Sequence, residues 1–188
     1  MLKHVAEFDR HILIAGFGNV KIRDIGEFLK KVQKEKTSNA EVQFFDAKLV
    51  ASWQHLYFAA LDALTAFKNN GNISKTIAVE TMLYASAQRQ IRKAVKFLGI
   101  TSNTSEIAVL IIGESLKEVK SNLQIISTFT NMRRDDVVLD LSEEKKVIIQ
   151  KAFGISDLEL KTAMKGDCLE TALINLVIER MALLATQR

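Results

Sequence analysis

The sequence contains no proline, and its 188 residues include only eight glycines and one cysteine. Average usage would give about nine prolines in a chain of this length, so the glycines must form most of the tight turns. The single Cys168 excludes an intrachain disulfide framework and any all-cysteine metal site. We therefore expect a cytoplasmic protein.

Long hydrophobic runs are also missing. The longest one, Ile107 to Ile112, is far shorter than the roughly 20 residues that a membrane-spanning helix needs. Charged residues at Glu7, Asp9 and Arg10 leave no secretory apolar region before the first expected strand. Because 48% of the residues are hydrophobic and charges of both signs are mixed, low-complexity disorder is excluded. We found no linker and no internal repeat, so residues 1–188 are expected to form a single domain.

The hydrophobic pattern predicts an α/β fold of the α+β type, in which a small central sheet of about four strands packs against six to eight helices. The pattern does not tell parallel strands from antiparallel ones. Strands are predicted at 11–16, 42–47, 106–113 and 137–141. Helix starts are predicted at Asp24, Ser52, Ser74, Ser115, Ser142, Ser156 and Asp167, with a break at 85–87 in the helix from Ser74.

Chemical motifs are weak, and we expect no catalytic residue, no metal site and no cofactor. Gly16-Phe17-Gly18 follows a strand but lacks the third glycine of a dinucleotide fingerprint. The three histidines have no partner at metal-ligand spacing. Cys168 lies at the first turn of a predicted helix, beside acidic residues that oppose thiolate formation, so we interpret it as a packed side chain. His55 is either a packing residue or a surface contact.

The stretch from Glu80 to Ile100 is more informative. Four cations gather on one side of the predicted helix, opposite an apolar stripe of Ile91, Ala94, Val95 and Leu98. Such a surface attracts phosphates, and arginine also stacks on unpaired bases. The alternative is a solvated helix face with cations near its C-terminus, where the helix dipole favours them. The cations are Arg89, Arg92, Lys93 and Lys96.

Two further features leave alternatives open. Glu80 interrupts an apolar stretch, so it is either at an edge or paired, and a pair with Arg89 across the break would fix the bend. The last helix is apolar around most of its circumference, so it is either wholly buried or completes its burial against another protein.

The chain resembles a known family over most of its length from about residue 10. The most specific segment runs from Glu80-Thr-Met-Leu-Tyr84 through Arg89-Gln90-Ile91 to Phe97-Leu98-Gly99-Ile100. Ala87 stands where many relatives have glycine. Further matching segments are Val42 to Ala47, Trp53 to Leu56, Phe153-Gly154-Ile155 and the helix from Leu169 to Arg180. On these residues the chain resembles the archaeal form of the small kinase-binding subunit of the KEOPS complex, related to the PRPK-binding protein of animals.

This resemblance implies a non-catalytic role. KEOPS makes the threonylcarbamoyl modification of adenosine in tRNA, and the family binds the N-terminal lobe of the complex's atypical kinase-ATPase. Archaeal members also hold the single-stranded 3′ CCA end of tRNA. The rival readings are a purely protein-binding adaptor without RNA contact and an unrecognised small-molecule enzyme. The resemblance suggests Arg89, Gln90, Arg92, Lys93, Lys96 and His55 for RNA, and the outer stripe Ile174, Val177, Ile178 and Met181 for the kinase.

Overall fold

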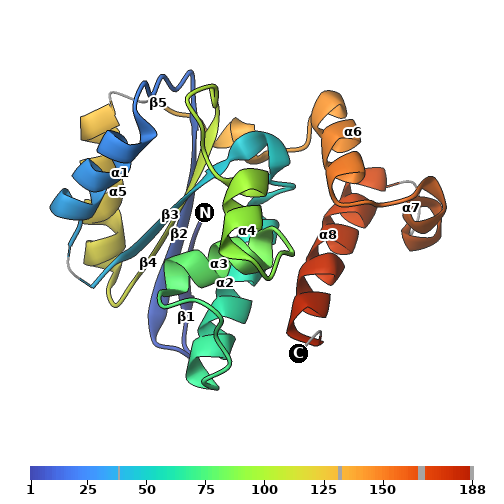
Figure 1. The fold of residues 1–188 in the computed structure, drawn as a ribbon, viewed down its shortest axis with the longest axis horizontal. Coiled ribbons are helices and arrows are strands. Elements are labelled where there is room, and N and C mark those ends of the chain that lie inside the picture. The colour runs from blue at the N-terminus through green and yellow to red at the C-terminus, as the bar shows by residue number, and fades with distance from the viewer. Residues whose placement is uncertain (38, 131–132, 165–167, 187–188) are drawn as a thin grey trace.

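An antiparallel sheet lies between two layers of helices in the computed structural model, which describes residues 1–37, 39–130, 133–164 and 168–186 (Figure 1). The strands follow the order β1-β2-β4-β3, and β5 also pairs with β2. The prediction of a small sheet packed against helices is thereby confirmed. The strands are β1 (Leu2–Val5), β2 (Arg10–Gly18), β3 (Glu41–Asp46), β4 (Ile107–Gly113) and β5 (Arg133–Arg134).

Strand β4 is the centre of the sheet. It pairs antiparallel with β2 on one side and with β3 on the other, so β2 and β3 run parallel to each other with β4 between them. All seven residues of β4 are buried because helices cover both faces of the sheet. The predicted strands at 11–16, 42–47 and 106–113 are confirmed.

The helices divide between the two faces of the sheet (Figure 1). One face carries α1 (Ile25–Glu35), which links β2 to β3, and α5 (Leu116–Thr130). The other face carries α2 (Trp53–Lys68), α3 (Ile77–Ala85) and α4 (Ile91–Leu98). Outside that layer lie the last three helices, α6 (Glu143–Ala152), α7 (Asp157–Ala163) and α8 (Leu169–Thr186).

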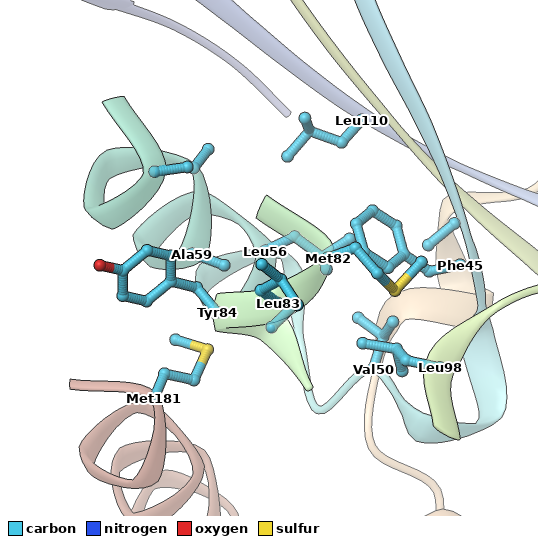
Figure 2. Packing of buried hydrophobic residues seen from close by; sticks show 14 of the residues in the cluster. Phe45, Val50, Leu56, Ala59, Met82, Leu83, Tyr84, Leu98, Leu110 and Met181 are labelled. Carbon is cyan, nitrogen blue, oxygen red and sulfur yellow. The ribbon is translucent and has the colours of Figure 1, made fainter. Parts of the chain in front are cut away.

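Successive side chains of β2 point to opposite faces of the sheet, and they contribute to a separate hydrophobic core on each face. Ile12 and Ile14 join the cluster beneath α2 and α3, whereas Leu13 and Phe17 join the cluster beneath α1 and α5. Figure 2 shows the first cluster, in which Met181 of α8 extends towards the helices that lie on the sheet. Helix α8 therefore completes the main core and also packs with α7.

Short polar side chains cap the helices, as the sequence predicted. Asp24, Ser52, Ser142 and Ser156 each accept a hydrogen bond from a backbone N–H in the first turn of the following helix. Helix α3 differs, because Thr76 and not Ser74 caps it. The cap predicted at Asp167 lies outside the described residues.

The strand predicted at 137–141 is wrong. Residues Asp136–Leu139 form a 3-10 helix, η2, and Ala47–Leu49 form another, η1. Asp135 accepts a hydrogen bond from the N–H of Val137, which turns the chain, and buried Lys145 donates to the carbonyls of Val138 and Asp140. These local bonds replace the ladder that a strand would need.

A candidate nucleic-acid interface

Helix α4 presents a positively charged surface. Of its eight residues only Ala94 and Leu98 are buried, and its N-cap residue, Gln90, makes no side-chain cap bond within the part of the chain that the structure describes. The Gln90 side chain therefore does not satisfy the first N–H groups of the helix, and the positive end of the helix dipole at this point favours an anion. The predicted cations all lie exposed on α4 or just before it: Arg89, Arg92, Lys93 and Lys96.

Two apolar side chains on the same helix, Ile91 and Val95, are exposed, although residue type alone would favour their burial. Ile91 is 45% exposed and Val95 is 51% exposed, so only two of the four residues of the apolar stripe, Ala94 and Leu98, are buried. Both residues lie within one helical turn of cations. A surface that combines cations with apolar side chains suits a ligand with both phosphates and flat apolar faces. We call Arg89 to Lys96 the α4 surface.

The turn between α3 and α4 sets the direction of this surface. Helix α3 ends at Ala85, as the predicted break requires. Ala87 then has a φ of +50°, in the left-handed region that favours glycine. Its N–H donates to the carbonyl of Tyr84, and the N–H of Gln88 donates to that of Leu83. This backbone conformation explains why the resemblance implies glycine at position 87, since glycine adopts a positive φ without steric cost.

A cavity of about 310 Å³ lies beside Arg89. The loop between α2 and α3 forms one wall, α3 and the turn after it form another, and the end of α8 contributes a third. Sequence reasoning missed this cavity, since it read residues 69–72 only as a helix end, and only the tertiary packing brings the loop to Arg89. The lining residues are Asn70, Gly71, Asn72, Ile73, Tyr84, Arg89 and Leu184.

Glu80 does not pair with Arg89. Its carboxylate accepts hydrogen bonds from the backbone N–H groups of Ile73 and Ser74, among the residues that the structure describes. The hypothesis that an ion pair between Glu80 and Arg89 fixes the bend is therefore wrong. Glu80 holds the loop that lines the cavity.

His55 belongs to the core, so the expectation that it reads a base edge does not fit its position. It is fully buried in α2, where Nδ1 accepts a hydrogen bond from the N–H of Ala51 and Nε2 donates to the carbonyl of Ala85. Burial lowers the pKa of its imidazole to about 4, against a smaller opposing effect of the bond to Ala85. The neutral ring also packs edge-to-face on Phe153.

The stripe predicted to meet the kinase is only partly accessible. Val177 and Met181 are fully buried, because α8 packs against α2, α3, α6 and α7 with these side chains inward. Their expected outward position is therefore wrong. Ile174 and Ile178 are half-buried and remain within reach of a partner.

Other candidate chemistry remains weak. A Cβ on Gly16 would lie 2.5 Å from the carbonyl oxygen of Asp135, so this glycine allows η2 to pack on β2. Cys168 is exposed, so its interpretation as a packed side chain is wrong. The hydrogen bond with the Thr171 hydroxyl is the main cause that lowers the pKa of its thiol. Within the described residues no cluster of three or more potential ligands would hold a metal ion, and no helix is long and apolar enough to cross a bilayer.

Comparison with known proteins assigns the family. The model of the family described as kinase binding protein CGI-121 matches residues 17–185. The chain is also similar to a protein named regulatory protein Cgi121 from Methanocaldococcus jannaschii, with 29% identity over 113 residues, covering 60% of this chain and 70% of the relative. The family match includes the α4 surface, the cavity beside Arg89 and α8. The chain therefore belongs to the CGI-121 family of kinase-binding proteins.

Proposed function

We propose that this chain is a non-catalytic cytoplasmic subunit that binds the atypical kinase-ATPase of the KEOPS complex and recruits tRNA by its 3′ CCA end. The family match supports the kinase-binding part, and the name of the archaeal relative supports a regulatory role. The α4 surface is the single observation that supports the RNA part.

The chemistry of the α4 surface suits a single strand better than a duplex. Arg92, Lys93 and Lys96 supply charge for phosphates, while exposed Ile91 and Val95 offer apolar contact to bases that are not paired. A duplex hides its base faces within the stack, so these apolar side chains would gain nothing from it. The unpaired 3′ end of tRNA exposes both phosphates and base faces.

The test reverses two charges of the α4 surface. We expect the double variant Arg92→Glu and Lys93→Glu to bind tRNA more weakly and to lower the salt dependence of binding by about one unit of slope for each lost phosphate contact. The matched control reverses Lys30 and Lys34, two exposed cations of α1 on the opposite face of the sheet (Figure 1). Titration of each protein with tRNA at several salt concentrations measures both quantities.

The comparison of tRNA with and without its CCA end decides between the two readings of the α4 surface. A sharp loss of affinity on removing CCA supports recruitment by the 3′ end. If both tRNAs bind equally weakly, or if the α1 control loses as much affinity as the α4 variant, the RNA part of the proposal is wrong. A purely protein-binding adaptor would then describe the chain better. Binding of ATP by the isolated chain would instead favour an enzyme.

For the kinase we propose a contact with the N-terminal lobe through α8. Ile174 and Ile178, one helical turn apart, are the members of the predicted stripe that a partner can reach. The support for this contact is the family match to kinase-binding proteins, which includes residues 169–185 of α8.

A further inference from the structure

Glu80 is a carboxylate placed where water cannot reach it. The residue is 1% exposed, and it interrupts the apolar face with which α3 packs on the core. The N–H of Ile73 lies 3.1 and 3.0 Å from its two oxygens, and the N–H of Ser74 lies 2.7 Å from Oε2. Burying a charge is costly unless hydrogen bonds compensate it. Here the compensation comes from the backbone of the loop between α2 and α3.

Glu80 fixes that loop at its centre. Bonds from Gly71 N–H to the Ala66 carbonyl and from the Asn72 side chain to the Ser74 carbonyl add local support, but both remain within or next to the loop. Most side chains from Asn69 to Lys75 are exposed, so few apolar contacts hold this segment to the core. The carboxylate of Glu80 therefore ties this loop to α3.

The loop is the wall of the cavity beside Arg89. Asn70, Asn72 and Ile73 face Tyr84 and Arg89 across it. Its volume of about 310 Å³ is at the lower end of the range for small-ligand pockets, which suits one nucleoside and not several. The lining offers the side-chain amides of Asn70 and Asn72 for base edges, and an apolar side chain, Ile73, that is 45% exposed.

We propose that Glu80 is a positioning residue of the RNA site, which holds the loop in place as the wall of a cavity for one unpaired nucleotide of the bound RNA. This inference rests on the proposed function and deepens it. Glu80 does not touch the nucleotide. An apolar side chain at this position would leave the N–H groups of Ile73 and Ser74 without this acceptor, whereas the two carboxylate oxygens accept from both. The charge is needed to capture two adjacent N–H donors of an otherwise exposed loop.

The test replaces Glu80 by glutamine, which keeps the shape but presents an NH2 group to donors that need an acceptor. We expect Glu80→Gln to bind CCA-ended tRNA about tenfold more weakly, the loss expected for one stacked base. Its affinity for tRNA lacking CCA should stay unchanged, and so should its salt dependence, since no phosphate contact is removed. Glu41→Gln is the matched control, because Glu41 accepts a bond from Ala78 N–H at the start of α3 but lies outside the cavity.

The outcomes separate the two proposals. If the wild-type chain does not distinguish the two tRNAs, the proposed function itself fails. If it does, and folded Glu80→Gln keeps the same ratio of affinities, Glu80 has no positioning role. Should Glu80→Gln not fold, Ser74→Ala removes the hydrogen bond from the Ser74 hydroxyl to the Thr76 carbonyl in the same loop, and Ser74 does not line the cavity. It should reduce the ratio in the same way, and an unchanged ratio there would overturn the inference.

Discussion

At the scale of single residues, Ala87 is the clearest point of backbone strain next to the α4 surface. Its φ of +50° costs an alanine about 1–2 kcal/mol relative to the right-handed region. Glycine avoids this cost but loses about 0.5–1 kcal/mol more conformational entropy on folding. We therefore expect Ala87→Gly to raise the free energy of unfolding by about 0.5–1 kcal/mol, measured by urea denaturation.

Ala85→Gly is the control for this prediction. Ala85 is fully buried at the end of α3 and has ordinary helical geometry, so glycine there should cost about 1 kcal/mol. Opposite signs for two identical substitutions two residues apart would confirm the backbone explanation. If both substitutions destabilise the protein, the turn carries no strain that glycine relieves.

The residue types predicted which charged side chains lie on the surface, but they did not predict which polar side chains are buried. The cations of α4 are exposed as their spacing indicated, because long charged side chains almost never fill a core. Glu80, His55 and Lys145 are buried, and each is bonded to backbone groups of a distant or adjacent segment. Those partners follow from the tertiary fold, so the one-dimensional pattern does not reveal them.

At the scale of elements, α8 carries two kinds of apolar position that the sequence does not distinguish. Ile178 is half-buried, whereas Met181, three residues later, is fully buried against the main core (Figure 2). A lysine at 178 keeps its stem on the apolar neighbours and its ammonium in water. We expect Ile178→Lys to weaken kinase binding at least about tenfold, measured by calorimetry, while it changes stability by no more than about 1 kcal/mol.

Met181→Lys is the matched variant on the same helix. It places an unpaired charge in the core and should lower the free energy of unfolding by about 4 kcal/mol. Normal kinase affinity of folded Ile178→Lys would show that the kinase binds elsewhere. A fully stable Met181→Lys would contradict the packing of α8.

Element prediction failed where segments are short and local bonds decide. Val137 to Leu141 has the β-branched composition of a strand, yet the Asp135 side chain and Lys145 hold it as η2. Strand β5 has only two residues, both arginines, and β1 has three exposed residues of four, so neither shows an apolar strand pattern. Long periodic segments such as β4 and α2 were predicted within one or two residues.

At the scale of the whole molecule, the sheet order could not be read from the sequence. Hydrophobic runs mark β2, β3 and β4 as buried, but β4 inserts between two strands that precede it in the chain. The inserted β4 pairs antiparallel with both of its neighbours. Helix α4, which leads into β4, lies on the same face of the sheet as α2 and α3. The candidate site then depends on contacts between the loop at 69–75, the turn at 86–90 and α8.

His55 connects three segments of the chain and makes the stability of the protein depend on pH. It joins the segment before α2 to the end of α3 and packs on Phe153 after α6. Burial lowers the pKa of His55 to about 4, while the unfolded chain takes up the proton near 6.5. Between these values the unfolded state binds more protons, so stability should fall as the pH drops from 6.5 to 4, by about 3 kcal/mol in all.

Urea denaturation at several pH values measures this loss, and His55→Gln isolates its cause. Glutamine can still donate to the Ala85 carbonyl but does not titrate, so the variant should be less stable at pH 7 and should lose less stability than wild type between pH 6.5 and 4. Carboxylates that protonate in the same range contribute equally to both proteins and cancel in the difference. If the two proteins lose stability in parallel, His55 is not the group that links the fold to acid, and its imidazole must gain access to water at low pH without unfolding.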